Sequence, residues 1–391
     1  MTTTEQVRLA EYTTLRLGGP AWRFSAAVTV TDLVDAVAAV DRDDEPVLVL
    51  GGGSNLVVAD AGFPGVVVRA ASDGARFAVG DGVAEVTAAA GQDWDELVRR
   101  CLAEGLSGIE CLSGIPGSAG ATPIQNVGAY GQEVAETIVS VQVYDRAAGQ
   151  VILLGAAELG FGYRTSMFKR QAAAASSAGG SQPGPAGGDP AGGGPGGCDS
   201  GARTGAAATG RFVVLEVTFR LPVSPLSAPV RYAELGRLLG VPEGGRVPVA
   251  DARAAVLELR RGKGMLLDAA DPDTRSAGSF FTNPVVPAAA CDELCGRLGA
   301  GTRIPHWPAG PGLVKLSAAW LIEQAGFGRG FGLADDPAGA RISTKHTLAL
   351  TNPGAATTTS LIRLARAIRD GVRAEFGVEL TNEPTLVGVT L

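Results

Sequence analysis

Residues 114–134 read GIPGSAGATPIQNVGAYGQEV, a stretch that no regular helix or strand accommodates. It holds five glycines and two prolines, with hydroxyl, amide and phenol side chains between them. Long irregular segments within compact domains tend to be functional, because ordinary connections are much shorter. The stretch therefore predicts a binding loop.

A second glycine-rich turn, GGGSN at 51–55, follows the short apolar run VLVL at 47–50. Glycine permits positive φ and lets backbone N–H groups approach an anion, and Ser54 and Asn55 add side-chain donors. Taken alone, GGGSN is also typical of a tight hairpin turn. Two such segments in one chain favour a site for a pyrophosphate and an adjoining ring. Leu56 stands where the dinucleotide fingerprint requires glycine, so that motif is excluded.

The first of three predicted regions, residues 1–70, alternates helix and strand. Thr31 is expected to cap the N-terminus of a helix with one apolar face. Strands are predicted at 47–50 and 65–69, on either side of the GGGSN turn.

The second predicted region, residues 71–225, contains the long loop. Asp93 and Glu96 resemble a capping box at the start of a helix, and Gly105 suits its C-terminal end. Alternation of apolar and polar residues predicts three further strands, at 138–144, 150–154 and 212–221.

Residues 171–210 consist mainly of Ala, Gly, Ser and Pro. Such a segment cannot bury enough surface to offset the entropy lost on ordering. We predict a disordered surface insertion between two strands of one domain, because a strand-like run resumes afterwards. A domain boundary is the alternative.

The third predicted region, residues 250–391, is a C-terminal α/β domain. Helices are expected at 316–325 and 359–375, and Gly377 is expected to end the second of them. Strand-like runs follow at 378–380 and 385–391.

The composition restricts the function. The net charge of -7 and the lack of a basic block with aromatics argue against a nucleic-acid partner. The polar N-terminus carries no secretory signal and no stretch could span a membrane, so a cytoplasmic protein is expected. The cysteines form an odd, scattered set without metal-ligand spacing, which predicts free thiols and no metal site. They are Cys101, Cys111, Cys198, Cys291 and Cys295.

Five motifs resemble those of the UDP-N-acetylenolpyruvoylglucosamine reductases, bacterial enzymes that make UDP-N-acetylmuramate for peptidoglycan. They occur in the family's order and span nearly the whole chain outside 171–210. They are GGGSN at 51–55, GIPGSAGATPIQNVGAYG at 114–131, YRTSMFK at 163–169, AGSFFTNP at 277–284 and LTNEPTLVG at 380–388.

The resemblance implies an α+β chain with a vanillyl-alcohol-oxidase/PCMH-type FAD-binding fold in two subdomains, followed by a C-terminal α/β substrate-binding domain. It implies non-covalent FAD, NADPH as reductant, and UDP-N-acetylglucosamine enolpyruvate as substrate. Some related flavoproteins attach FAD through a histidine. Only His306 and His346 occur here, and neither lies in a flavin-loop motif.

Three residues match the family's catalytic positions. Arg164 would take up charge that develops on the substrate carboxylate, Glu383 would act with it, and Ser279 would donate a proton. The chain departs from the family at two positions. Asn382 replaces the usual proline before the glutamate, and Thr282 replaces a lysine that many relatives carry.

The remaining matched positions are expected to bind the cofactor or the substrate. Tyr232, in VRYAEL, indicates the family's tyrosine-loop type. The cofactor set is Gly51, Gly52, Gly53, Ser54, Asn55, Leu56, Ile115, Pro116, Gly117, Ser118, Gly120, Ala121, Thr122, Gln125, Asn126, Gly128, Ala129 and Tyr130. The substrate set is Tyr163, Tyr232, Lys263, Asn283 and Lys315.

Two alternatives remain at this level. A flavin oxidase of the same wider fold could act on an alcohol or a sugar, but covalent-flavin histidine motifs are absent. A nucleotide-sugar sensor could keep the fold without catalysis, but Arg164, Ser279 and Glu383 are all present.

Overall fold

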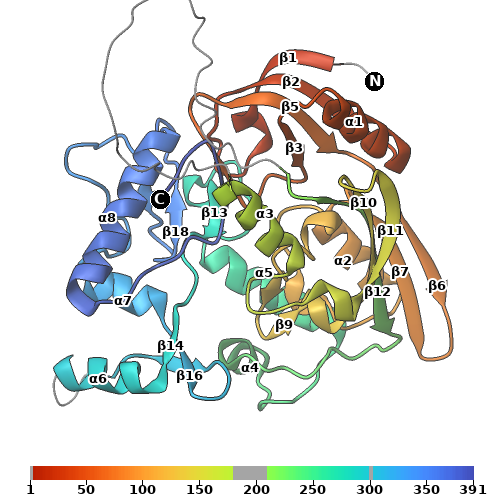
Figure 1. Ribbon diagram of the computed structural model, residues 1–391. Helices are drawn as coiled ribbons and strands as arrows, with labels where there is room; N and C mark the ends of the chain where they lie inside the picture. The colour runs from red at the N-terminus through yellow and green to blue at the C-terminus, as the bar shows by residue number, and fades with distance from the viewer. Residues whose placement is uncertain (1–2, 179–208, 299–302) are drawn as a thin grey trace, which may run out of the picture.

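The computed structural model describes residues 3–178, 209–298 and 303–391. Figure 1 shows the N-terminal sheet and helix at the top, a larger antiparallel sheet on the right, and the C-terminal helices on the left. No helix in these described ranges is long and apolar enough to cross a membrane.

The N-terminal sheet has four strands in the order β1-β2-β5-β3, and α1 packs on it. The strands β2, β5 and β3 run parallel, while β1 pairs with β2 in the antiparallel sense. The elements are β1 (Thr3–Arg8), β2 (Pro20–Ala27), α1 (Val30–Arg42), β3 (Val47–Leu50) and β5 (Phe63–Ala70).

The predicted cap of α1 is wrong. The cap is Thr29, which has an extended backbone. Its side-chain oxygen accepts the N–H of Asp32, while the Asp32 carboxylate accepts the N–H of Thr29. This reciprocal pair satisfies two terminal donors at once, and Thr31 already lies inside the first turn. The predicted apolar face is confirmed, with Leu33, Val37 and Val40 buried.

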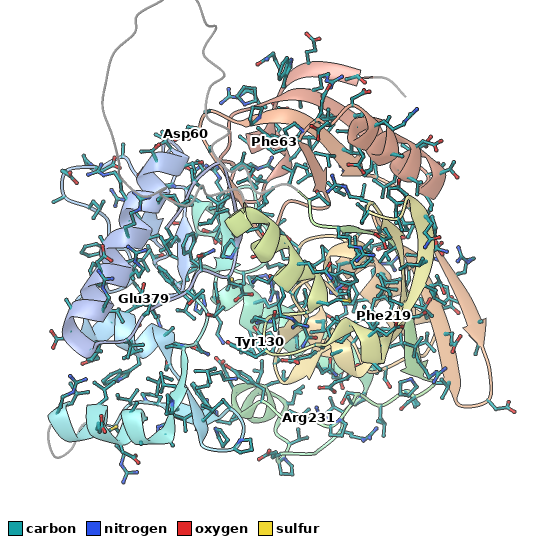
Figure 2. The ribbon with its side chains drawn as sticks, in the orientation of Figure 1. Asp60, Phe63, Tyr130, Phe219, Arg231 and Glu379 are labelled. Carbon is teal, nitrogen blue, oxygen red and sulfur yellow. The ribbon has the colours of Figure 1, made fainter. Side chains whose placement is uncertain are left out.

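The second sheet is antiparallel, with strand order β11-β10-β12-β7-β6. One of its faces covers α2 and the long loop, and Trp94 and Phe219 lie in that core (Figure 2 labels Phe219). The elements are β6 (Ala75–Val79), β7 (Val83–Ala89), α2 (Trp94–Ala103), β10 (Ile138–Asp145), β11 (Gln150–Gly155) and β12 (Phe212–Pro222). The three predicted strands are confirmed. Asp93 caps α2 by accepting the N–H of Glu96, and Gly105 follows its end at φ +73°.

The other face of this sheet joins the N-terminal sheet. Tyr144, Val213 and Leu215 share a buried cluster with the apolar face of α1. The two sheets are therefore one packed unit.

The segment 171–210 is only partly what its composition predicts. The helix α3 (Met167–Ala178) continues into its first eight residues, 171–178. Alanine has the highest helix propensity, so a helix that starts in the preceding motif can extend through this stretch. The strands on either side, β11 and β12, both pair with β10, so the segment does interrupt a single sheet. Residues 179–208 lie outside the described residues.

The C-terminal part contains two small sheets and several helices. The sheets have strand orders β13-β18-β17 and β14-β16-β15. The strands are β13 (Ser276–Ser279), β14 (Val285–Pro287), β15 (His306–Pro308), β16 (Leu313–Leu316), β17 (Arg341–Ile342) and β18 (Ala349–Thr351). The helices are α4 (Ala233–Leu239), α5 (Val249–Gly262), α6 (Ala288–Leu298), α7 (Ala318–Gln324) and α8 (Thr358–Phe376).

Both predicted C-terminal helices are present, and Gly377 ends α8 in the left-handed conformation. The strand predicted at 378–380 is wrong: these residues are irregular. Val378 and Leu380 instead pack into the core built on α8, so their apolar character reflects burial and not strand pairing.

The last strand returns to the start of the chain. β19 (Thr385–Val387) pairs in parallel with β4 (Leu56–Val58), directly after the GGGSN turn. This pairing carries Glu383 to the first glycine-rich turn. The division of the chain at 1–70, 71–225 and 250–391 stays a prediction.

Candidate active site

The two glycine-rich loops pack directly on each other. A Cβ atom built on Gly52 would lie 2.6 Å from Gly117 Cα, and one on Gly51 would lie 2.6 Å from Ser118 Oγ. Gly53 has φ +61° and its Cβ would lie 1.8 Å from the Tyr12 carbonyl oxygen. Only glycine fits these contacts, so the loops form one joint surface.

This surface offers hydrogen-bond donors that the protein does not use. Within the described ranges, the amide N–H groups of residues 52–55 donate to no protein acceptor. Adjacent free N–H groups in glycine-rich backbone form an anion-binding concavity. The loops therefore fit a pyrophosphate.

Gly52→Ala is expected to weaken flavin binding strongly. Its Cβ would collide with the Gly117 backbone, which cannot swing aside as a flexible side chain can. We expect lower flavin content in the purified protein and a loss of about 1–3 kcal/mol in unfolding free energy. Absorbance spectra and urea unfolding measure both.

Gly296→Ala is the matched control. Gly296 is exposed in α6, and a Cβ there meets no atom within 4 Å. This change should leave the flavin content unchanged and should stabilise the helix slightly. Full flavin occupancy in the Gly52 variant would contradict the packing described here.

Other residues of the long loop serve the scaffold. The amides of Gly120, Ala121 and Thr122 donate to Ala90, Ser118 and Ala119. The backbone N–H groups of these three residues are therefore already used within the protein, so a contact with a cofactor would have to involve other atoms.

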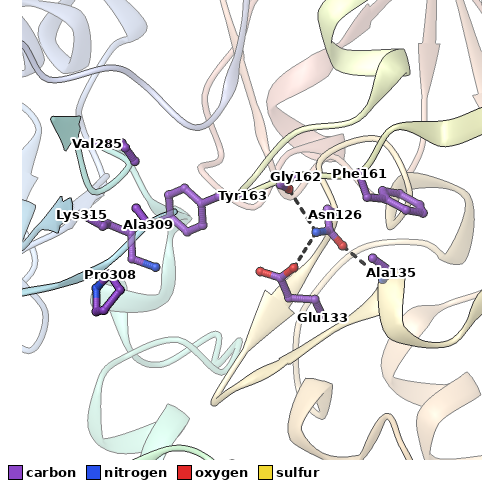
Figure 3. A pocket seen from close by; sticks show the side chains of 10 residues that line it. All are labelled: Asn126, Glu133, Ala135, Phe161, Gly162, Tyr163, Val285, Pro308, Ala309 and Lys315. Carbon is purple, nitrogen blue, oxygen red and sulfur yellow. Dashed lines mark hydrogen bonds between the residues drawn. The ribbon is translucent and has the colours of Figure 1, made fainter. Parts of the chain in front are cut away.

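Asn126 is also fully engaged. Its amide nitrogen donates to Glu133 at 2.7 Å and to the Gly162 carbonyl at 3.1 Å, and its oxygen accepts the Ala135 N–H at 3.1 Å (Figure 3). The bond to Gly162 ties the long loop to the turn that carries Arg164, and the other two hold the end of the loop itself.

Other predicted cofactor residues either bridge the two glycine-rich loops or pair with another part of the long loop. Gln125 accepts a hydrogen bond from Asn55, which links the two glycine-rich loops. Gly128 and Ala129 form β8, which pairs with β9 (Gln132–Glu133).

Arg164 and Glu383 are an ion pair, 219 positions apart in the sequence. Arg164 Nε lies 3.3 Å from Glu383 Oε1, and the two side chains are 26% and 12% exposed. Arg164 holds φ +52°, unusual for a residue with a side chain. Its Nε makes no well-aligned hydrogen bond within the described residues. A strained, unsatisfied cation in a partly buried site is typical of a functional residue.

The backbone of Glu383 is held at three points. Its N–H donates to the Phe280 carbonyl at 2.8 Å. Its carbonyl accepts Lys169 Nζ at 3.0 Å and Asn55 Nδ2 at 3.5 Å. Asn382, the departure from the family pattern, turns its side chain back to the Pro384 carbonyl at 2.7 Å, so it stays within the local turn.

Ser279 ends β13 beside Phe280, the residue that anchors Glu383. Its Oγ lies 3.5 Å from His346 Nε2. Burial, and then the charges of Lys263 and Arg329, lower the pKa of His346 to about 4. The imidazole beside Ser279 is therefore neutral at pH 7. Sequence reasoning missed His346 as a site residue, because no local motif marks it.

His346 makes folding stability depend on pH. The unfolded chain protonates this histidine below about pH 6.5, whereas the folded protein resists protonation down to about pH 4. Its contribution is complete above pH 6.5 and is lost as the pH falls to 4, by at most about 3 kcal/mol. Urea unfolding of wild type and His346→Asn from pH 4 to 8 should give a difference that shrinks toward acid. A difference independent of pH would contradict this.

A cavity of about 380 Å³ lies next to Arg164. Figure 3 shows Asn126 and Glu133 on one side, and the Tyr163 ring together with Lys315, Val285 and Pro308 on the other. It thus opens between the long-loop region and the small C-terminal sheet.

The cavity brings predicted substrate residues together. Lys315 Nζ lies 4.3 Å from the centre of the Tyr163 ring. Burial lowers the pKa of Lys315, Glu133 opposes this, and Arg164 adds to it. Asn283 accepts the Ala318 N–H at 2.9 Å at the start of α7. Burial raises the pKa of the Tyr163 phenol, while the charge of Arg164 and then hydrogen bonds with Asn283 oppose that rise.

The other predicted substrate residues form a second cluster. The rings of Tyr130 and Tyr232 meet edge to face, 5.4 Å apart. Lys263 Nζ lies 5.6 and 5.7 Å from their centres and pairs with Glu234 at 2.5 Å. Burial raises the pKa of the Tyr130 phenol to about 12. Glu234 and Glu133 were not predicted, since carboxylates beside lysines leave no motif.

The cysteines agree with expectation where the structure describes them. Cys101, Cys111, Cys291 and Cys295 are free thiols. Burial raises the pKa of Cys101 and Cys111 to about 12. Cys198 lies outside the described residues.

The class of protein follows from the glycine-rich loops and the region that carries them. A family model described as FAD binding domain matches residues 24–155, which include both loops. The chain is an FAD-binding oxidoreductase. A second family model, described as UDP-N-acetylenolpyruvoylglucosamine reductase, C-terminal domain, matches residues 271–387.

Relatives match over the full length. UDP-N-acetylenolpyruvoylglucosamine reductase of Thermobifida fusca is 52% identical over 98% of this chain and 98% of its own. The enzyme of that name from Saccharopolyspora erythraea is 52% identical over 98% of this chain and 95% of its own. The chain therefore belongs to the UDP-N-acetylenolpyruvoylglucosamine reductase family.

A solved structure supports the predicted fold. The crystal structure of the reductase from Thermus caldophilus aligns with a TM-score of 0.58 and 23% identity, over 99% of this chain and 100% of that one. The predicted order, an FAD-binding domain of the vanillyl-alcohol-oxidase/PCMH type and then the reductase C-terminal domain, is confirmed. The expected activity, a flavoprotein reductase of peptidoglycan precursor synthesis, is confirmed as well.

Proposed function

We propose that this enzyme reduces UDP-N-acetylglucosamine enolpyruvate to UDP-N-acetylmuramate, with NADPH as reductant and non-covalent FAD as carrier. The observation that carries the proposal is the Arg164–Glu383 pair. The backbone N–H of Glu383 donates to the carbonyl of Phe280, the residue that follows Ser279 at the end of β13. All three expected catalytic residues thus belong to one connected site.

The residues present fit FAD. The free N–H groups of 52–55 suit its pyrophosphate, with Ser54 and Ser118 as neighbouring hydroxyls. Bound FAD supplies hydride transfer from NADPH to the substrate. His306 lies in strand β15 and His346 lies beside Ser279. Neither histidine belongs to a glycine-rich loop. That placement supports non-covalent binding.

The enol ether is electron-rich, so hydride addition to one carbon requires the attached carboxylate to take up negative charge. Arg164 can donate two parallel hydrogen bonds to that carboxylate, which stabilises charge that appears only in the transition state. The ion pair with Glu383 holds the guanidinium in place. Ser279 then donates its proton to the other carbon, and water restores the hydroxyl.

The cations of the site suit an anionic substrate. Burial is the largest cause of the lowered pKa of Lys169 and of Lys315, and the charge of Arg164 lowers both further, so the three groups interact across the site. Their field attracts the carboxylate and diphosphate of a UDP-sugar. Thr282 donates its hydroxyl to the Thr381 carbonyl at 3.3 Å, so the phosphate contact that a lysine would make there falls to Lys263 and Lys315.

We also assign the chain to the tyrosine-loop type. Tyr232 stands immediately before α4 and is 40% exposed, with its ring against Tyr130 and its neighbour Lys263. An exposed ring beside a lysine can close over a bound nucleotide sugar. We further assign two FAD-binding subdomains, at 1–70 and 71–225, and a substrate-binding domain at 250–391.

The decisive test is NADPH oxidation by the purified protein with and without the enolpyruvyl sugar. The protein should be yellow, acid precipitation should release its FAD, and fast oxidation should require the sugar. A protein that stays colourless after incubation with FAD would overturn the proposal. So would an oxidation rate that does not depend on the sugar.

A further inference from the structure

Lys169 is a partly buried lysine outside the three catalytic positions. It stands in the first turn of α3, five residues after Arg164. Its Nζ donates to the main-chain carbonyl of Glu383 at 3.0 Å. Burial lowers its pKa, the charge of Glu383 opposes that shift, and Arg164 adds to it. The ammonium group thus lies within the field of both members of the catalytic pair.

A buried ammonium on a neutral carbonyl costs desolvation energy that a surface ion pair avoids. Within the described residues, Lys169 has no carboxylate oxygen within ion-pair distance. The chain has only four lysines, at 169, 263, 315 and 345, among 33 lysine and arginine residues. Burial of the Lys169 ammonium therefore costs desolvation energy that no ion pair in the described part of the chain offsets.

The carbonyl that Lys169 binds is a junction of three separate segments. Asn55 of the first glycine-rich turn donates to the same oxygen at 3.5 Å, and the Asn55 carbonyl accepts the Thr385 N–H at 3.0 Å. Glu383 is therefore fixed to the flavin loop on one side and to the helix that follows Arg164 on the other. Without Lys169, the long contact from Asn55 would be the one hydrogen bond left at this oxygen among the described residues.

We propose that Lys169 is a positioning residue: its hydrogen bond to the Glu383 carbonyl fixes the Glu383 carboxylate against Arg164 for substrate reduction. This inference rests on the proposed function, in which Arg164 and Glu383 act on the enolpyruvyl group. Because its hydrogen bond goes to Glu383, Lys169 bears on the second half-reaction and leaves the reduction of FAD by NADPH intact.

The test uses Lys169→Met, which keeps a long, unbranched side chain and removes the ammonium group. In rapid mixing, bleaching of the flavin by NADPH should be within about twofold of wild type. Re-oxidation by the enolpyruvyl sugar should slow by roughly 10²-fold, because displacement of a catalytic group by about 1 Å, here the Glu383 carboxylate, slows a reaction by about that factor. In steady state, kcat should fall more than KM rises.

Arg170→Met is the matched control. Arg170 is the next residue of α3, is exposed, and also binds a main-chain carbonyl, that of Gly160 at 3.0 Å. Both half-reactions should keep their wild-type rates in this variant.

Restoring the ammonium tests the role of the group directly. Lys169→Cys, alkylated with bromoethylamine, carries a lysine analogue, and mass spectrometry confirms modification at 169. Treated wild type controls for the other cysteines. Re-oxidation should recover at least tenfold over the untreated variant; no recovery would overturn the proposal.

Two further results would overturn the proposal. One is a Lys169→Met variant whose flavin is re-oxidised as fast as that of Arg170→Met. The other is a Lys169→Met variant in which both half-reactions are slowed by the same factor. Failure of the proposed function itself is distinguishable, because wild type would then show no re-oxidation by the sugar.

Discussion

Ser279→Ala is expected to stop substrate reduction while leaving the flavin reducible. NADPH should still bleach the bound FAD at the wild-type rate, because Ser279 takes no part in that step. Re-oxidation by the enolpyruvyl sugar should slow by about 10²–10⁴-fold, the usual contribution of a positioned proton donor. Stopped-flow absorbance of the flavin separates the two half-reactions.

Ser276→Ala is the control for this result. Ser276 belongs to the same strand, and its Oγ accepts the backbone N–H of Gly278 at 3.3 Å. Its loss should leave both half-reactions unchanged. Normal re-oxidation in Ser279→Ala would remove this hydroxyl from the mechanism.

Arg164→Lys should have an effect of similar size. Lysine keeps the charge but loses the planar pair of donors that fits a carboxylate. Loss of one preorganised donor to a developing anion costs about 10²–10³-fold in kcat. Steady-state kinetics should therefore show a large fall in kcat at saturating sugar, with flavin content unchanged.

The ion pair between Arg164 and Glu383 adds a second requirement. Because the two side chains are in contact, removing either one disables the same unit. Arg164→Lys combined with Glu383→Gln should therefore lose much less than the product of the two single effects. Multiplicative losses would show that the two residues act independently.

Local patterns predicted the elements whose cause is local. The helix after Asp93 and the helix ended by Gly377 depend on caps and on one apolar face, both visible within a few residues. The errors also have local causes. Thr31 lost the cap to Thr29, because Asp32 completes a reciprocal pair only with that residue. The run at 378–380 was apolar because it is buried beside α8, although it pairs with no strand.

The candidate site divides in the same way. Motifs marked Arg164, Ser279 and Glu383, but they did not mark His346, Glu133 or Glu234. Each of these three interacts with a predicted site residue that is distant in sequence: Ser279, Lys315 and Lys263 respectively. Lys169 lay inside a quoted motif, yet its partner is 214 positions away.

The sequence by itself determined that two glycine-rich loops would form, since their clustered glycines and prolines fit no regular helix or strand. It also determined the family, through motifs in a common order. The tertiary structure alone decided that these loops, Lys169 and Glu383 would meet. That meeting depends on the parallel pairing of β19 with β4, whose strands lie more than 300 residues apart. Hydrogen bonds between such distant strands leave no periodic trace in either segment, so no local pattern could reveal them.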